Sequence, residues 1–214
     1  MTRRTLAVAA LAALATSLLA GCSASPAASP SAISSPTASA TPSSAPSPSE
    51  SPSPVIAEPL PLAISSSDFV DGSGLASTFA GGQGGCPGDN LSPQLTWEEG
   101  PAGTVTYAIS VTDADAANFT HWLHYNIPAD ITSVGRGGGA ELAGTEGRNS
   151  LTGIGYFGPC PPSGAHHYVF TVYALDTTLA PETVISWPEF AFVHSKGHVL
   201  AQGQITGIYP NPAG

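Results

Sequence analysis

Histidine is the side chain that most readily changes charge near neutral pH, and this chain holds six histidines in three pairs. The pairs are His121 with His124, His166 with His167, and His194 with His198. On a strand, residues one or three positions apart point to opposite faces, so neither of the first two pairs can close on one metal ion. The third pair has a spacing compatible with zinc binding on a helix, but no carboxylate completes it, so we expect no metal site.

A different set of side chains could bind a small anion. His166 and Tyr168 share one face of an expected strand, His121 begins a second strand, and Asp113 ends a third. Imidazolium and phenol groups donate hydrogen bonds, and a carboxylate orients a histidine and favours its charged form. The glycine-containing loop at 155–162 could add backbone amides in a concave arrangement. The residues alone leave an alternative open, in which Tyr168 and His166 only satisfy each other in the core.

An enzyme with a nucleophilic side chain is the first competing hypothesis. The chain has no Gly-x-Ser-x-Gly motif, and Ser163 lacks the strand-to-helix turn that exposes a nucleophilic serine. Cys160 could act as a thiolate beside His166. This hypothesis requires that Cys160 be free.

The three cysteines argue against a free Cys160. Cys22 closes the segment Leu19-Ala20-Gly21-Cys22, which resembles the lipobox in which bacterial lipoproteins carry their lipid. If Cys22 is lipidated, Cys86 and Cys160 remain as an even pair in an oxidising compartment, and we expect a disulfide between them. That bond would close a loop of about 75 residues and stabilise the fold by roughly 4 kcal/mol.

The composition divides the chain into three parts. Residues 1–21 carry Arg3 and Arg4 before a short apolar run, which is the layout of a lipoprotein signal peptide. The alternative is an ordinary signal peptide with an incidental cysteine. The export route, general secretory or twin-arginine, stays open. Residues 22–61 form a linker, since Ser23 to Pro54 contain 13 Ser, 8 Pro and 7 Ala and have almost nothing to bury. Residues 62–214 are enough for one domain with a hydrophobic core.

The charge balance excludes one class of partner. The formal charge is −10, and without Arg3 and Arg4 three basic residues remain against 15 acidic ones, a balance of −12. Nucleic-acid binding needs clustered Lys and Arg, which this chain lacks. Any anion must therefore be held by a local pocket.

The elements that position these groups are mostly strands. Apolar and polar residues alternate over 104–112, which predicts a half-buried strand, and residues 121–127, 166–175 and 205–209 also read as strands. One helix is expected from Pro188, with Phe190, Val193, Gly197 and Leu200 on one face. Strands joined by long Gly/Pro loops predict a mainly β fold, an antiparallel β-sandwich with one or two short helices.

Several ordered motifs resemble those of the phosphatidylethanolamine-binding protein (PEBP) family, in its bacterial branch related to Raf kinase inhibitor proteins. The first is Asp113-Ala114-Asp115-Ala116-Ala117 followed by His121-Trp122, and the second runs from Gly147-Arg148-Asn149 through Gly155-Tyr156-Phe157-Gly158-Pro159-Cys160-Pro161-Pro162 to His166-His167-Tyr168. Asn90-Leu91-Ser92-Pro93 and His198-Val199-Leu200-Ala201 resemble its early and late regions. Ala114 and Ala117 stand where the family has prolines, and the connection from Asp113 to His121 is short.

The resemblance implies a β-sandwich with a small pocket for phosphate-like anions or phospholipid head groups. Carried over position by position, the ligand-binding residues are Asp113, His121, Gly158, Pro161, Pro162, His166 and Tyr168. The expected protein is a non-enzymatic binding protein without a cofactor, held by lipid on the extracytoplasmic side of the cell membrane. Because the family includes protease inhibitors, an alternative is that the domain binds an extracytoplasmic protease.

Overall fold

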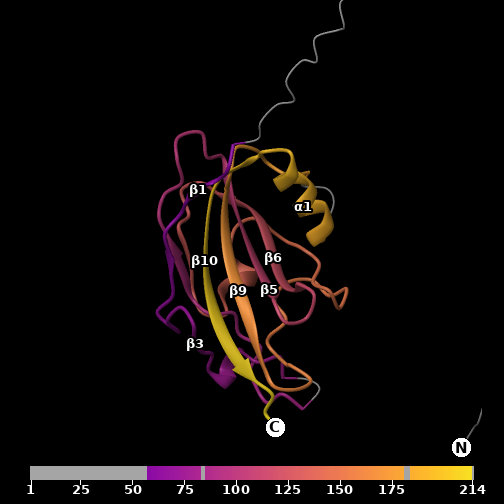
Figure 1. Cartoon of the computed structure of the whole chain (residues 1–214). Helices are drawn as coiled ribbons and strands as arrows, with labels where there is room; N and C mark the ends of the chain where they lie inside the picture. Colours follow the sequence, from indigo (N-terminus) through magenta and orange to yellow (C-terminus); the bar gives the residue numbers. More distant parts are fainter. Residues whose placement is uncertain (1–56, 83–84, 181–183, 214) are drawn as a thin grey trace, which may run out of the picture. The chain divides into compact units, whose positions relative to one another are not determined.

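Long antiparallel strands form the centre of the fold (Figure 1). In this computed structural model, which describes residues 57–82, 85–180 and 184–213, they are β5 (Thr106–Asp113), β6 (Phe119–Pro128), β9 (Ala165–Leu175) and β10 (Val199–Pro210). They lie side by side in the order β10, β9, β5, β6. The strands predicted at 104–112, 121–127, 166–175 and 205–209 all fall in this group, although the last begins six residues earlier than expected.

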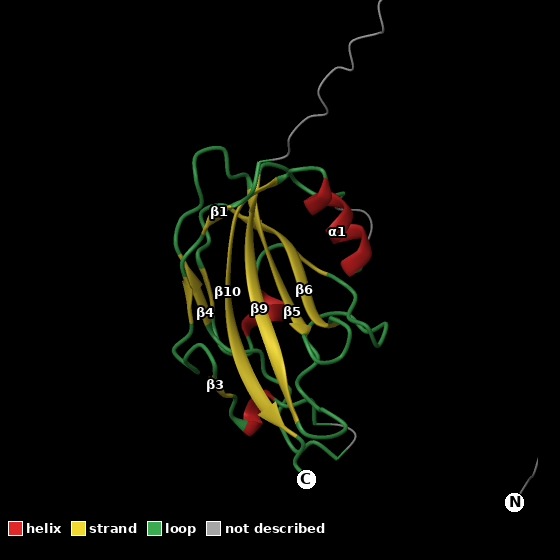
Figure 2. Ribbon diagram, viewed as in Figure 1, coloured by secondary structure: helices red, strands yellow, loops and turns green. Residues whose placement is uncertain are grey.

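Short strands and turns of helix complete the described fold (Figure 2). The larger sheet also contains β1 (Leu60–Pro61), β3 (Ser73–Gly74) and β8 (Thr145–Glu146), while β2 (Ile64–Ser65), β4 (Leu95–Trp97) and β7 (Ser133–Val134) form a second sheet. The 3-10 helices η1 and η2 span Ser77–Phe79 and Gly138–Glu141. The prediction of a mainly β fold with two sheets and few helices is confirmed, with the addition that β1 and β3 pair in parallel with β10.

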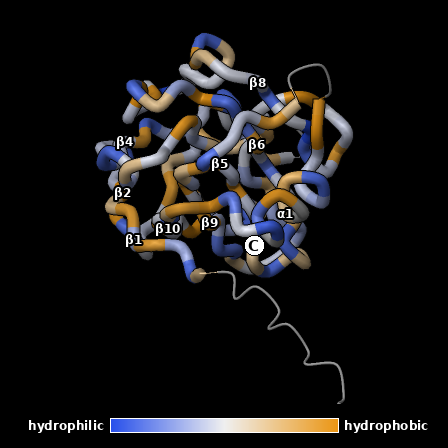
Figure 3. The backbone as a smooth tube through the Cα atoms, turned by 90° about the horizontal axis from the view of Figure 1, so that it is seen from above, coloured by the Kyte–Doolittle hydropathy of each residue, from blue (hydrophilic) through white to orange (hydrophobic). Residues whose placement is uncertain are grey.

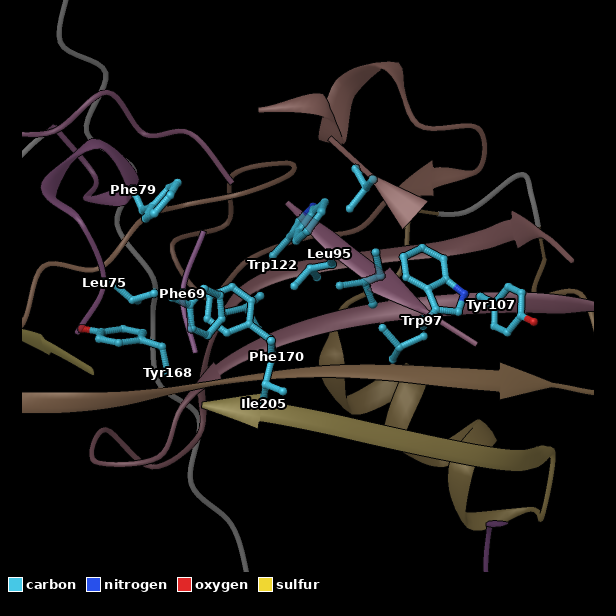
Figure 4. Packing of buried hydrophobic residues seen from close by; sticks show 14 of the residues in the cluster. Phe69, Leu75, Phe79, Leu95, Trp97, Tyr107, Trp122, Tyr168, Phe170 and Ile205 are labelled. Carbon is cyan, nitrogen blue, oxygen red and sulfur yellow. The ribbon is translucent and has the colours of Figure 1, made fainter. Parts of the chain in front are cut away.

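The large sheet buries side chains on both of its faces. Tyr168, Phe170 and Val172 of β9 pack into one apolar cluster, while Tyr173 and Leu175 of the same strand pack into a second cluster beneath α1 (Trp187–Ser195). Figure 3 shows α1 and the small sheet on opposite sides of the central strands, and Figure 4 shows the first cluster at close range. Strand β5 is consequently buried along its whole length, and the prediction of a half-buried strand is wrong because α1 covers its second face.

The helix is shorter than predicted. Ser186 and Glu189 form a capping box at its start, and Phe190 and Val193 pack against the sheet as expected. The helix ends at Ser195, and Gly197 follows with φ of +80°, a left-handed conformation that terminates helices. Leu200 therefore lies in β10 rather than on the helix face.

Strand pairing begins at Leu60, two residues before the expected start of the domain at residue 62. Leu60 and Pro61, assigned above to the linker of residues 22–61, form β1 and pair with Ala201 and Gln202 of β10. The signal peptide of residues 1–21, Cys22 and the linker as far as residue 56 lie outside the described residues. The helices in the described part of the chain are all too short or too polar to span a membrane.

Candidate functional site

The predicted site residues meet at one end of the large sheet. Asp113 is the last residue of β5, His121 lies near the start of β6, and His166 and Tyr168 lie near the start of β9. These side chains line a pocket of about 620 Å³. The rest of its lining consists of Asp115, Ala116, Phe119, Leu151, Phe157, Cys160, Pro161 and Pro162.

A β-bulge directs His121 into the pocket. Val111 of β5 lies opposite Trp122, and the next residue, Thr112, lies opposite Thr120, so His121 has no partner across the ladder. A bulge of this kind bends the strand and turns the side chain of the extra residue. The regular alternation of strand 121–127 assumed from the sequence could not show this irregularity.

Phe157 determines which ring nitrogen of His121 carries a proton. His121 Nδ1 lies 2.6 Å from the carbonyl oxygen of Phe157, and because a carbonyl can only accept, Nδ1 must donate. The side chain is 4% exposed. Burial lowers the pKa of His121 below its ordinary range, and the hydrogen bond to Phe157 and the carboxylate of Asp113 oppose this effect. A neutral His121 then has its lone pair on Nε2.

Both carboxylate oxygens of Asp113 accept hydrogen bonds from the protein. Its Oδ2 accepts a hydrogen bond from His166 Nδ1 at 2.7 Å, and its Oδ1 accepts one from the backbone N–H of Asp115 at 2.9 Å. The next pair repeats this arrangement at the surface, where Asp115 Oδ2 accepts from His167 Nδ1 at 2.8 Å. The carboxylate of Asp113 thus orients His166, as the sequence predicts, and each of its oxygens already accepts one hydrogen bond from the protein.

The hydroxyl of Tyr168 is a buried polar group without a hydrogen-bond partner in the described structure. Burial, and secondarily the nearby charge of Asp113, raises the pKa of Tyr168, so the phenol remains protonated and able to donate. The backbone of Cys160 is near enough to influence this pKa without meeting the geometry of a hydrogen bond. His166 and Tyr168 therefore do not satisfy each other, and that alternative is wrong.

The loop at 155–162 contributes walls rather than free amides. Pro161 and Pro162 line the pocket as predicted, but Gly158 does not, because its backbone N–H donates to Asn90 Oδ1 at 2.8 Å. The N–H of Phe157 is also occupied, since it donates to the carbonyl of His121 at 2.8 Å. The expectation that glycine amides of this loop face an anion is therefore corrected.

Asn90 and the disulfide attach this loop to the segment that follows η1. Besides its bond to Gly158, Asn90 donates from Nδ2 to the carbonyl of Tyr156 at 3.3 Å. Cys86 and Cys160 form the predicted disulfide, so Cys160 is not the thiolate that the nucleophile hypothesis requires. Asn90 is 68 residues from Gly158, so no local spacing in the sequence could indicate its supporting role.

The turn after β5 explains one departure from the family pattern. Ala117 has φ of +50° and Asn118 has φ of +58°, both in the left-handed region. Proline is restricted to φ near −65°, so it could not take the conformation observed at position 117.

The remaining histidines lie outside the pocket. His124 is buried, with Nδ1 at 3.9 Å from Glu146 Oε1, and His194 packs against the ring of Tyr173. His198 follows the helix instead of lying on it, and its Nδ1 bonds to Asp176 Oδ1 at 2.8 Å. The helical zinc spacing considered for His194 and His198 therefore does not exist, and the described residues contain no cluster of metal-ligating side chains.

Comparisons with known proteins agree with this geometry. The family model for phosphatidylethanolamine-binding protein matches residues 65–210, a range that contains every pocket residue. YbcL of Escherichia coli is 34% identical over 164 residues, covering 72% of this chain and 90% of YbcL. Its crystal structure, described as a new member of the mammalian PEBP family, gives a TM-score of 0.64 at 32% identity and covers 70% of this chain and 98% of that one.

Two further relatives come from other microorganisms. A UPF0098 protein of Methanothermobacter thermautotrophicus is 39% identical over 130 residues, covering 58% of this chain and 85% of its own. LppC of Mycobacterium tuberculosis, whose name marks it as a candidate lipoprotein, is 39% identical over 127 residues, or 56% of this chain and 58% of its own. The family resemblance therefore extends to a protein with a lipoprotein name.

Proposed function

The chain belongs to the phosphatidylethanolamine-binding protein family, and we propose that its pocket binds phosphate-like anions or phospholipid head groups without catalysing a reaction. The observation that carries this proposal is the unpaired hydroxyl of Tyr168 at a site where His121 and His166 also converge. A buried hydroxyl without a partner destabilises a protein by about 1–3 kcal/mol, so a ligand oxygen that accepts its proton is favoured.

The anion would be bound by hydrogen-bond donors of histidine and tyrosine side chains rather than by Lys or Arg. No Lys or Arg is among the described residues that line the pocket, so the positive charge must come from histidine. Asp113 Oδ2 lies 2.7 Å from His166 Nδ1, so the carboxylate holds the imidazole ring of His166 in one orientation at the pocket. Each charge-assisted hydrogen bond contributes about 1.5–3 kcal/mol, so a few of them give roughly millimolar to micromolar affinity.

Calorimetric titration of the full chain with phosphate, and with sulfate as an anion that does not titrate in this range, tests the proposal. We expect Tyr168→Phe to weaken both anions about tenfold, because it removes one donor and leaves the ring in place. Tyr209→Phe is a matched control, since Tyr209 is also buried but does not line the pocket. Affinities that are unchanged in Tyr168→Phe would contradict the proposal.

A second experiment tests the alternative that the domain binds an exported protease. If an exported protease is the partner, it should be recovered with the tagged chain, and excess phosphate should not displace it unless the pocket is the contact. Recovery of a protease whose binding is unaffected by phosphate and by Tyr168→Phe would favour the inhibitor hypothesis. Loss of the captured protease on adding phosphate would instead indicate that the same pocket serves both ligands.

We also propose that Cys22 anchors the domain to the extracytoplasmic face of a membrane. This proposal is supported by the lipobox-like segment ending at Cys22 and by the name of LppC. Two or more acyl chains give stable membrane attachment. Replacing Cys22 by Ser should move the protein out of the detergent-soluble membrane fraction, whereas Cys86→Ser should not; equal membrane recovery of both variants would contradict the anchor.

A further inference from the structure

A second pocket, of about 390 Å³, lies beside the first and is lined by different residues. Two stretches of chain separate the pockets: Phe119 and Leu151 line the first, while their neighbours Thr120 and Ser150 line the second. The Ser150 N–H donates to the Thr120 carbonyl at 2.9 Å, and the Thr120 N–H donates to Ser150 Oγ at 2.8 Å. The second pocket therefore has a wall fixed by hydrogen bonds, and its volume is within the range of roughly 300–1,000 Å³ found for small-molecule sites.

Arg148 supplies a positive charge to the second pocket. Its backbone N–H donates to the carbonyl of Ile185 at 2.9 Å, which fixes the base of the side chain. The guanidinium carries several N–H donors, of which Nη1 donates to the carbonyl of Thr152 at 3.3 Å. Arg136 forms an ion pair with Asp68, whereas Arg148 forms none with any residue that the structure describes. The exposed guanidinium can therefore bind an anion from solution.

Two hydroxyl groups add donors that the protein leaves unused. Thr120 is 3% exposed, yet it lines the second pocket, and its hydroxyl makes no hydrogen bond within the described part of the chain. Ser150 Oγ accepts the N–H of Thr120, so the hydroxyl proton of Ser150 is still available. Because an unpaired polar group is costly when buried, a ligand oxygen that accepts from Thr120 is favoured.

The surroundings of the second pocket favour an anion with one negative charge and an apolar group. Glu189 lies in the first turn of α1, and the charge of Arg148 adds to the lowering of its pKa by its hydrogen bonds to Ser186. Glu189 would repel a second negative charge on the ligand. Trp187, which is half-buried, and Pro188, which is exposed, line the same pocket. An apolar group beside the anion would remove their surface from water.

We infer that the second pocket binds a carboxylate that carries an apolar group, with the carboxylate at Arg148 and Thr120 and the apolar group against Trp187. A guanidinium can donate parallel hydrogen bonds to both oxygens of a carboxylate, which suits a planar anion with a single charge. Two sources share this chemistry, a small free carboxylic acid and the C-terminal residue of a peptide. The inference does not depend on the anion site proposed above, because the two pockets share no lining residue.

Titration of the full chain with N-acetylleucine at neutral pH, followed by nuclear magnetic resonance, tests the inference. The chain contains three tryptophans, so three indole N–H signals are expected, and Trp187→Phe identifies the signal of Trp187. This signal should shift during the titration, whereas the signals of Trp97 and Trp122, which are buried and line neither of these two pockets, should not. N-acetylleucine amide, which lacks the charge, should bind about tenfold more weakly or worse.

Variants of the lining identify the groups that bind the carboxylate. Arg148→Gln should weaken N-acetylleucine by about tenfold or more. Arg148→Lys should weaken it less, because lysine keeps the charge and loses only the parallel donors. Thr120→Val, which replaces the hydroxyl by a methyl group, should weaken it several-fold. Arg136→Gln is the matched control, since it changes the net charge equally at an arginine outside the pocket, and it should leave the affinity unchanged.

The possible results separate this inference from the proposed function. An unchanged Trp187 signal, equal affinities for N-acetylleucine and its amide, or normal binding by Arg148→Gln would overturn the inference and leave the phosphate titrations of Tyr168→Phe unaffected. An acetylated tripeptide that ends in leucine distinguishes the sources. Tighter binding than that of N-acetylleucine supports the inference with a peptide end as ligand, and equal or weaker binding supports it with a small free acid.

Discussion

Phe157 and His121 hold each other through both backbone and side chain. The N–H of Phe157 donates to the carbonyl of His121 at 2.8 Å, and His121 Nδ1 donates to the carbonyl of Phe157 at 2.6 Å. Their rings stack with a centroid distance of 5.7 Å and an interplanar angle of 19°. These two residues, one in a strand and one in a loop, thus form a unit that fixes the tautomer of His121. Nε2 is left as the ring nitrogen that can gain or lose a proton.

This unit predicts a pH dependence of stability. The pKa of His121 is lowered by burial in the folded state, so between this value and the unfolded value of about 6.5 the unfolded chain binds more protons. The contribution of His121 to the free energy of unfolding is therefore present above about pH 6.5 and falls as the pH drops through this window. Urea denaturation from pH 7.5 to 5 should show a shallower dependence in His121→Asn, whose amide N–H can still donate to Phe157; equal slopes would contradict the prediction.

The same group predicts a dependence of anion binding on pH. A bound anion favours the protonated Nε2, so binding should raise the pKa of His121 and take up a proton. Because the free pKa is depressed, the gain in sulfate affinity from His121 should come below about pH 6.5 and not near pH 7.5. Sulfate titrations at these values provide the measurement, and sulfate affinity in His121→Asn should vary less with pH than in the unaltered chain.

Asn90 is predicted to be a positioning residue for the pocket. Its side chain bonds to both neighbours of Phe157, and its φ of +55° is a conformation that asparagine tolerates better than alanine. Asn90→Ala should lower the free energy of unfolding by about 1–3 kcal/mol and weaken phosphate binding. Asn90→Gly removes the same side-chain bonds, but glycine adopts the positive φ at this position without strain. It should therefore be more stable in urea than Asn90→Ala while still binding phosphate weakly. Normal phosphate binding in Asn90→Gly would exclude the positioning role.

Side-chain alternation was sufficient to predict the long strands and the two faces of β9. The same alternation predicted that His166 and Tyr168 share one face of their strand and that Asp113 ends its strand, because all three follow the regular repeat of a strand. The bulge at His121 depends on how β6 pairs with β5, and strands of two or three residues such as β1 and β7 depend on pairing with distant segments. The unpaired hydroxyl of Tyr168 and the hydrogen bond of the Gly158 N–H to Asn90 likewise depend on contacts between residues far apart in the sequence. Local sequence patterns cannot predict such contacts.

The disulfide predicts a large and separable effect on stability. Cys86 and Cys160 are 74 residues apart, and the chain-entropy model gives a stabilisation of about 4 kcal/mol for such a loop. Reduction, or the double substitution Cys86→Ser and Cys160→Ser, should lower the free energy of unfolding by this order. Phosphate binding should also weaken, because Cys160 is part of the pocket wall. The measurement is urea denaturation with and without reductant, with mass spectrometry to verify the bond; an unchanged midpoint after verified reduction would contradict the prediction.

Gly158 is required by close packing of two backbone segments. A Cβ atom at this position would lie 2.2 Å from the carbonyl oxygen of Phe79 and 2.7 Å from the backbone nitrogen of Gly81, neither of which is a flexible side chain. Gly158→Ala must therefore separate the pocket loop from the segment after η1. This separation should lower the free energy of unfolding by about 1–3 kcal/mol. It should also move the Phe157 carbonyl away from His121. Gly135→Ala is the matched control, since nothing lies within 4 Å of its added Cβ and its φ is not positive, and its stability should stay within about 0.5 kcal/mol of the unaltered chain. Urea denaturation and phosphate titration of both variants provide the test, and equal behaviour of the two would show that the loop adapts to a side chain at position 158.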